Sequence, residues 1–239
     1  MPPQLPLGEE IDWKGAQAPA RTTLHGAHVL LRPVDPLRDA EPLYAVSHPP
    51  EGDETIWTYL PDGPYESPEQ LRRMLASVES SEDPLFFTVE PSDRPLGLCC
   101  YMRIKPHWGV IEIGHIWFGA PLKHTTAATE AIYLMARHAF DELGYRRLEW
   151  KCNSLNAASR RAAERLGFSF EGIFHQHQIV KGRNRDTAWY AITDEQWPAI
   201  RAGFEAWLSP ENLTKDGLQR RSLSDLRGEP LSQSSEPLS

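Results

Sequence analysis

The chain is poor in cysteine and in long apolar stretches. Only three of its 239 residues are cysteines, Cys99, Cys100 and Cys152, and their spacing suits neither a metal site nor a disulfide framework. No apolar run approaches the ~20 residues of a membrane-spanning helix, and the first residues lack the basic-then-apolar order of a secretion signal. These absences predict a cytoplasmic protein that spans no membrane and binds no metal.

The chain also has fewer basic than acidic residues. The sequence has 25 lysines and arginines against 33 aspartates and glutamates, a formal net charge of −8. Proteins that bind nucleic acids usually carry a basic surface. The charge therefore argues against a nucleic-acid partner, but it allows a local basic patch for an anionic small molecule.

The two ends of the chain differ in composition from the middle. Proline, alanine and glycine dominate residues 1–22, and residues 209–239 are rich in serine, proline, glutamate, leucine and arginine without periodicity. Such segments bury little apolar surface. We therefore predict one domain over 23–208, an extended N-terminal arm (1–22) and a mobile C-terminal tail (209–239). The arm would lie over the domain or against a second copy in a homodimer.

Strand-like and helix-like patterns alternate between the two ends. Strands are predicted over 29–33, 85–89, 96–104, 110–118, 147–152, 168–180 and 187–192, and helices over 38–47, 67–80, 125–143, 157–166 and 195–208. The strands first meander and then alternate with helices, which indicates an α/β or α+β class with a mixed sheet.

A candidate phosphate-binding loop joins the strand at 110–118 to the next helix. A helix N-terminus presents unpaired N–H groups and the positive end of the helix dipole, which suit a phosphate. An ordinary threonine-capped helix is the alternative interpretation. The residues concerned are small after a basic start: Lys123, His124, Thr125, Thr126, Ala127 and Ala128.

A second candidate lies where a strand leads into the short helix at 157–166. Asn153 and Asn156 precede this helix, and Ser159 lies in its first turn. Asparagine side chains there can hold the amides of an extended ligand, or Asn156 can simply cap the helix. The Ser159 hydroxyl can donate to a leaving sulfur or bond back to its own helix. The residues alone leave both interpretations open.

Glu112 is a carboxylate within an apolar strand. Side-chain alternation predicts that Glu112 and Gly114 share one face and that His115 lies on the other. A buried carboxylate is costly unless it is paired, so Glu112 is either a general base for an amine or the ion-pair partner of Arg103 or Lys151. A histidine in such a strand is more often a core residue than a catalytic one.

Taken in order, five short motifs resemble the GNAT superfamily of N-acetyltransferases, and in particular its RimJ/RimL-like branch of ribosomal-protein N-terminal acetyltransferases. The motifs occupy residues 24–33, 113–118, 153–159, 165–172 and 185–190. The resemblance implies the GNAT fold, a mixed and mostly antiparallel central sheet with a splayed pair of parallel strands, flanked by helices.

The same resemblance implies acetyl-CoA as co-substrate. Backbone of the central strand would pair with its pantetheine arm, the amides of the loop at 123–128 would hold its pyrophosphate, and Ser159 would assist departure of the thiol. The implied cofactor-binding residues are Ile116, Trp117, Phe118, Lys123, His124, Thr125, Thr126, Ala127, Ala128, Asn153, Asn156 and Ser159.

Four positions depart from the family pattern, the first being Lys123, which replaces the Gln or Arg that opens the pyrophosphate loop. The tyrosine that many members use as general acid falls on Ala163, a carboxylate of some ribosomal-protein acetyltransferases falls on Gln178, and Thr126 replaces the first glycine of the pyrophosphate loop. These departures leave Glu112, acting through a water molecule, as the leading base, with Ser159 as the second catalytic residue.

The sequence therefore predicts an enzyme that moves the acetyl group of acetyl-CoA to a primary amine, on a small molecule or a peptide N-terminus, by direct attack in a ternary complex. The acceptor would enter between the early helices and the last hairpin, where aromatic residues could line its path or belong to the core: Trp57, Tyr59, Tyr65, Trp108 and Trp189, the last of which is more typical of a core residue. One alternative is a covalent intermediate on Cys152. Another is a non-catalytic CoA-binding regulatory module, which Ala163 and Gln178 favour.

Overall fold

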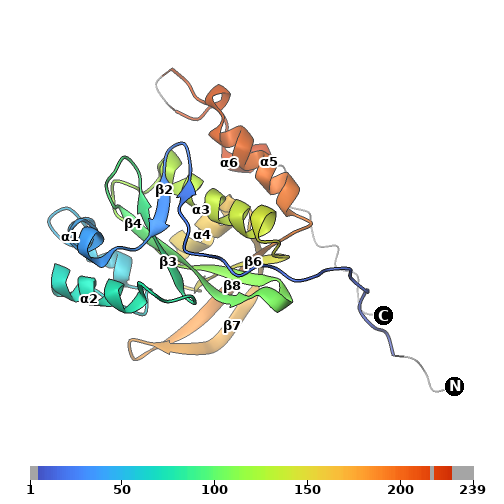
Figure 1. Cartoon of the computed structure of the whole chain (residues 1–239), viewed down its shortest axis with the longest axis horizontal. Coiled ribbons are helices and arrows are strands. Elements are labelled where there is room, and N and C mark those ends of the chain that lie inside the picture. The colour runs from blue at the N-terminus through green and yellow to red at the C-terminus, as the bar shows by residue number, and fades with distance from the viewer. Residues whose placement is uncertain (1–4, 216–217, 228–239) are drawn as a thin grey trace.

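A mixed sheet of eight strands organises the domain (Figure 1), in the order β1-β2-β3-β4-β5-β6-β8-β7. The computed structural model describes residues 5–215 and 218–227. Within that part of the chain, β5 and β6 are parallel and the other neighbouring strands are antiparallel. The predicted mixed, mostly antiparallel sheet with one parallel pair is confirmed.

The elements follow the order that the apolar patterns predict. The strands are β1 (Leu24–His25), β2 (Leu30–Pro33), β3 (Leu85–Glu90), β4 (Gly97–Lys105), β5 (Val110–Phe118), β6 (Arg147–Asn153), β7 (Ser169–Val180) and β8 (Arg183–Thr193). The α-helices are α1 (Pro36–Ser47), α2 (Pro68–Val78), α3 (Thr126–Arg137), α4 (Ala157–Leu166), α5 (Trp197–Leu208) and α6 (Leu223–Arg227), and short 3-10 turns cover Glu54–Trp57, Pro106–Trp108 and Pro210–Asn212.

The helix predicted over 125–143 changes its winding before its end. α3 stops at Arg137, and residues His138–Glu142 form a π-helical turn. The hydroxyl of Tyr101 on β4 donates to the Met135 carbonyl, 2.5 Å away. That carbonyl belongs to the last turn of α3. The change from α-helix to π-helix therefore coincides with a contact to β4, which the sequence pattern does not reveal.

Helices α3 and α4 cover one face of the sheet. Tyr101, Ile113, Trp150 and Tyr190 lie side by side across β4, β5, β6 and β8, so their side chains share a face. Tyr101 bonds to α3, while Trp150 and Tyr190 bond to Ser159 and other residues of α4.

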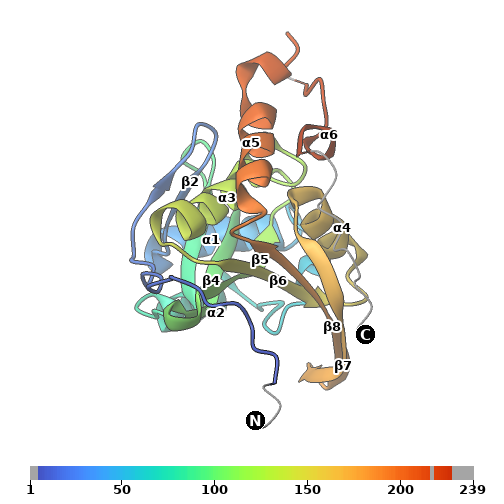
Figure 2. The same cartoon turned by 90° about the vertical axis from the view of Figure 1, so that its right-hand side faces the viewer.

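Helices α1 and α2 lie side by side against the opposite face, over β2 and β3 (Figure 1). Asp39 of α1 is fully buried there, where it accepts hydrogen bonds from Thr88 of β3 and Arg32 of β2. Figure 2 shows the β7–β8 hairpin projecting away from this body, with α5 and α6 at the other end. On β5 and β6 the same face carries the charged side chains of Glu112, Glu149 and Lys151.

Both ends of the chain contact the domain where they are described. In the arm, the Gln17 N–H donates to the Leu143 carbonyl at 2.8 Å and the Trp13 indole donates to the Gly144 carbonyl at 3.2 Å. In the expected tail, α6 packs against α5, and Leu223 is buried. Residues 1–4 of the predicted arm, and 216–217 and 228–239 of the predicted tail, lie outside the described residues. Across the described part, no helix is long and apolar enough to cross a membrane.

Candidate active site

The two parallel strands separate partway along their length. β5 and β6 pair from Val110 opposite Arg147 to Ile113 opposite Trp150. Beyond that point β5 continues to Phe118, hydrogen-bonded to β4 on one side, and β6 continues to Asn153, hydrogen-bonded to β8. The facing edges of the two strand ends therefore border an opening, and Ile116, Trp117 and Phe118 lie on its β5 edge.

A β-bulge in β5 reorients His115. Leu98 pairs with Trp117 and Cys100 pairs with Gly114, so His115 and Ile116 together oppose Cys99. His115 has a φ of 48°, in the left-handed region. Its ring lies 5.3 Å from that of Phe86, whose strand position is on the same face as Gly114. The prediction that His115 faces away from Glu112 and Gly114 is therefore wrong, because a bulge interrupts the alternation.

His115 lines a narrow pocket of about 10 Å³, room for a group of about the size of one water molecule, between the sheet and the segment that joins α1 to α2. The pocket wall consists of Trp57, Leu60, Asp62, Tyr65, Met74, Phe86, Leu98, His115 and Trp117. Trp57 and Tyr65 thus lie where the acceptor is expected, whereas Trp108 is exposed at the other end of β5.

His115 has the properties of a proton acceptor. Its Nδ1 lies 4.0 Å from a carboxylate oxygen of Asp62. Burial is the main cause that lowers the pKa of His115 below 6.5, although the nearby carboxylates of Asp62 and Glu112 oppose the shift. The imidazole is therefore neutral at pH 7 and has a nitrogen lone pair available.

The tip of the β7–β8 hairpin is bound to the same segment. The Lys181 ammonium donates to the carbonyls of Trp57, at 2.8 Å, and Asp62, at 3.0 Å. On the other side, the Tyr59 hydroxyl donates to the Leu155 carbonyl at 3.3 Å. The segment that roofs the pocket is thus held by the hairpin and by the β6–α4 turn.

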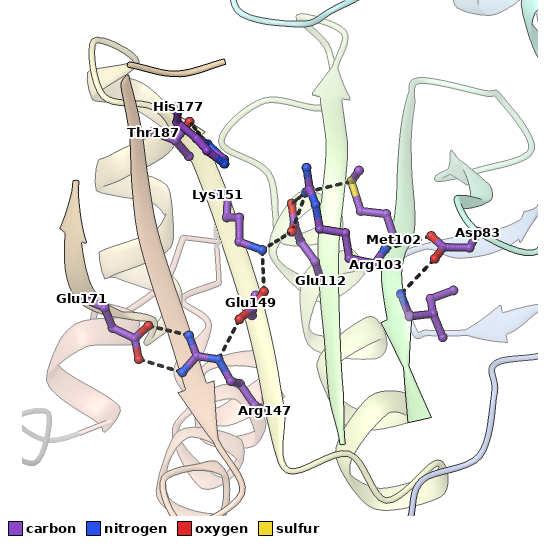
Figure 3. A network of polar contacts seen from close by, with 11 residues as sticks. Asp83, Met102, Arg103, Glu112, Arg147, Glu149, Lys151, Glu171, His177 and Thr187 are labelled. Atoms are coloured by element: carbon purple, nitrogen blue, oxygen red, sulfur yellow. Dashed lines mark hydrogen bonds and ion pairs between the residues drawn. The ribbon is translucent and has the colours of Figure 1, made fainter. Parts of the chain in front are cut away.

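Glu112 belongs to a chain of ion pairs across the sheet (Figure 3). Both of its oxygens accept from Arg103 Nη1 at 2.7 Å, and Lys151 Nζ donates to one of them at 2.7 Å. Lys151 also bonds to Glu149, whose other oxygen accepts from Arg147. The side chains of Glu112 and Lys151 are only 3% and 4% exposed. Of the two interpretations of Glu112, the ion pair is therefore present, and with both predicted partners.

This chain of charges keeps Glu149 ionised. Burial would raise the pKa of Glu149, but hydrogen bonds from Lys151 and Arg147 lower it below the ordinary value. The Lys151 ammonium also lies 4.0 Å from the centre of the Trp189 ring, a cation–π contact. The charges compensate one another inside the sheet, so Glu112 is held by two cations rather than presented to the pocket.

The N-terminus of α3 lies at the end of the loop that follows β5. Thr125 caps the helix: its hydroxyl oxygen accepts from the Ala128 N–H at 3.1 Å. The first-turn N–H groups of Thr126 and Ala127 have no partner within a helix and suit a phosphate. Lys123 is exposed in the preceding turn, and His124 has a φ of 62°. The capped helix is thus present, and it leaves donors for an anion.

The β6–α4 turn places Ser159 near the opening. The Asn153 side chain accepts from the Leu155 N–H at 2.9 Å, and that of Asn156 accepts from the Ser159 N–H at 3.1 Å. Trp150 Nε1 donates to the Ser159 hydroxyl oxygen at 3.0 Å, so the hydroxyl proton is available to the Cys152 sulfur or to a ligand. Both asparagines therefore shape the turn.

Cys152 is a poor nucleophile in this setting. Its side chain is buried, and burial raises the pKa of the thiol, although a hydrogen bond with Ser159 opposes the rise. A thiol needs to be ionised to attack. Nor does any group of three potential metal ligands occur among the described residues.

Comparison with known proteins identifies the family. Residues 28–169, more than half of the chain, match the family described as the acetyltransferase (GNAT) domain. A GCN5-related N-acetyltransferase from Brucella melitensis has a similar structure, with a TM-score of 0.86 and 42% identity over 90% of this chain and 98% of that one. The chain belongs to the GNAT acetyltransferase family and is an acyltransferase that uses acetyl-CoA.

Other relatives agree on the family. A probable GNAT-family acetyltransferase from Chromobacterium violaceum has a TM-score of 0.75 and 38% identity over 83% of this chain and 100% of that one. An uncharacterized N-acetyltransferase of Bacillus licheniformis is 25% identical over 73% of this chain and 98% of its own length. A putative ribosomal-protein-serine acetyltransferase from Vibrio cholerae, 16% identical over 72% of this chain and 97% of that one with a TM-score of 0.62, shares the fold.

Proposed function

We propose that this enzyme acetylates a primary amine by direct attack within a ternary complex. The observation that carries the proposal is the arrangement around the end of β5. One side of this strand end borders the opening between β5 and β6, and its bulge directs His115 into the pocket beneath the α1–α2 segment. Acetyl-CoA and an amine could thus meet at one strand.

The residues around the opening suit acetyl-CoA. The first turn of α3 supplies N–H groups for the pyrophosphate, and the small side chains of Ala127 and Ala128 allow close approach. The backbone of Ile116, Trp117 and Phe118 would run beside the pantetheine, with Asn153 and Asn156 at the far edge. Bound acetyl-CoA supplies the electrophilic thioester carbon.

We assign the proton transfers to His115 and Ser159. As the amine nitrogen bonds to the thioester carbon, His115 Nδ1 or Nε2 takes the amine proton, and Asp62 stabilises the resulting imidazolium. N–H groups near the end of β5 would hold the oxyanion. The carbon–sulfur bond then breaks as Ser159 gives its proton to the departing sulfur and regains one, through solvent, from the His115 imidazolium, so that both side chains return to their starting state. Glu112 is proposed as a positioning residue, because two cations already bind its carboxylate.

The proposal is tested by measuring free thiol released from acetyl-CoA in the presence of a panel of primary amines, with acetyl-CoA affinity measured separately by calorimetry. His115→Gln should lower kcat by about 10²–10⁴-fold, the usual contribution of a general base, with acetyl-CoA affinity unchanged. Binding of acetyl-CoA without thiol release for any amine would support the non-catalytic CoA-binding module instead.

A more specific proposal is that the enzyme belongs to the RimJ/RimL-like branch of ribosomal-protein acetyltransferases. The five motifs in order support it, while Gln178 stands where some of these enzymes have a carboxylate. Acetylation of peptides that copy ribosomal-protein N-termini, compared with small amines, distinguishes this branch from the rest of the family.

A further inference from the structure

Arg185 of β8 lies close enough to His115 for its positive charge to lower the pKa of the imidazole. On β8, Thr187 pairs with Asn153, the last residue of β6. Arg185 precedes Thr187 by two residues on β8, so it lies beyond the end of β6. Its side chain is on the same face of the sheet as those of Thr187 and Trp189. That face also carries Glu112 and Lys151 (Figure 3).

A bulge in β7 marks this part of the hairpin. Phe174 pairs with Thr187 and Gln178 pairs with Arg185, so three residues of β7 oppose one of β8. Asp186 fixes the bulge by accepting from the Gln176 N–H at 2.8 Å and by contacting His175 Nδ1 at 3.0 Å. Asp186, the carboxylate next to Arg185 in the sequence, is therefore occupied.

The guanidinium of Arg185 lacks a counter-ion in the described part of the chain. Its Nε is buried and forms no hydrogen bond to any described residue. The negative charge of Glu112 raises the pKa of Arg185, but the Glu112 carboxylate already binds Arg103 and Lys151. Burial lowers the pKa of Arg185, and the positive charge of Arg103 adds to this effect. Arginine remains protonated in proteins, so this is an unneutralised, half-buried cation.

Other buried donors without partners lie on the same side of the sheet as Arg185. Within the described residues, the Trp57 and Trp189 indole N–H groups and the Tyr65 hydroxyl also lack a hydrogen-bond partner. Trp57 and Tyr65 line the pocket together with His115, and the pKa of His115, lowered mainly by burial, is lowered further by the charges of Arg103 and Arg185. Buried polar groups normally have partners, so this group of donors calls for a ligand that supplies acceptor oxygens.

We infer that the acceptor amine carries a carboxylate and that Arg185 binds it. The planar guanidinium matches a carboxylate, and one unpaired arginine balances one negative charge, which favours a carboxylate over a doubly charged phosphate. Asp62 and His115 would face the amine, so the two ends of the acceptor meet groups of opposite charge. This inference rests on the proposed amine acetylation and adds the chemical class of the substrate.

The test compares amines with and without the carboxylate. Glycine, β-alanine, γ-aminobutyrate and L-phenylalanine are each paired with the corresponding amide, at equal concentrations of unprotonated amine. Thiol release gives kcat and KM, and calorimetry gives the acetyl-CoA affinity. In at least one pair, the kcat/KM of the wild type should be about tenfold or more higher for the acid than for the amide. Tenfold corresponds to the free energy of a hydrogen bond to a charged group.

Variants of Arg185 and Arg183 then test whether Arg185 causes the preference for the acid. Arg185→Gln should abolish it through a higher KM, Arg185→Lys should retain part of it, and both should bind acetyl-CoA as the wild type does. Arg183→Gln removes the same charge from an exposed position on the same strand and should preserve the preference.

Three results would overturn the inference: equal rates for acid and amide in every pair, a preference that survives Arg185→Gln, or a loss of acetyl-CoA affinity in that variant, which would assign Arg185 to the co-substrate. In each of these cases amine acetylation itself persists. Absence of thiol release with every amine would instead refute the proposed function, and this inference with it.

Discussion

Glu112→Gln separates a structural role of this residue from a catalytic one. The substitution preserves the shape of the side chain and removes its charge. Lys151, 4% exposed, then keeps Glu149 as its remaining acidic partner. Removing one member of a buried ion pair typically costs 3–5 kcal/mol, and because Glu149 compensates in part we expect a loss of about 3 kcal/mol. Arg103 is half-exposed, so solvent screens its loss.

This loss should be visible in thermal unfolding. For a chain of this size, ~1 kcal/mol corresponds to a Tm shift of roughly 2–4 °C, so Tm should fall by about 6–12 °C. At a temperature where the variant is folded, kcat should stay within about tenfold of the wild type, because His115 takes the proton. The Glu112 charge raises the pKa of His115, so its removal should shift the pH profile toward lower pH.

Two further variants sharpen the result. Combining Glu112→Leu with Lys151→Met should recover part of the lost stability, since an apolar replacement of a buried pair is often neutral or stabilising and Glu149 keeps its bond from Arg147. Glu69→Gln breaks an exposed ion pair with Arg72 and should leave Tm unchanged. If Glu112→Gln instead keeps the wild-type Tm and loses kcat by more than about 100-fold, Glu112 is the base and the role assigned to His115 is wrong.

Three other perturbations follow from the same structure. Ser159→Ala should lower kcat by about 10²-fold or more while leaving acetyl-CoA affinity intact in calorimetry; an unchanged kcat would remove its role as proton donor. Leu223→Ala should destabilise the fold by about 2–5 kcal/mol in urea unfolding, the usual cost of truncating a buried leucine; no effect would mean that α6 does not pack in solution. Burial lowers the pKa of His115 and of His138, so the unfolded chain binds protons more readily. The free energy of unfolding should therefore fall as the pH drops below about 6.5, and should fall less steeply in His138→Gln.

The order and type of the elements were predictable because they depend on local patterns. The strand at 110–118 and the helix at 157–166 match β5 and α4, since an apolar run and the Asn156 cap leave a direct trace in the sequence. The site was less predictable. The bulge at His115 depends on the pairing of β5 with β4, and no glycine or proline at that residue signals it.

Long-range partners explain the remaining differences. Glu112 was equally consistent with a base and with an ion pair until the register brought Lys151 beside it. Residues 209–227 carry no clear periodicity, yet α6 forms because Leu223 finds a buried position against α5. Arg185 matched a family motif only as part of a longer stretch, and its lack of a counter-ion could be recognised only in three dimensions.

The two hydrogen bonds from Lys181 have a consequence for how molecules reach the pocket. They join the hairpin tip to the segment near Trp57, and Tyr59 joins that segment to the β6–α4 turn. Three segments that are distant in the sequence are thus bonded to one another beside the pocket. Any acceptor too large to fit beneath the joined segments would reach His115 only after the Lys181 contacts break, so Lys181→Met should raise the rate with bulky acceptors more than with small ones.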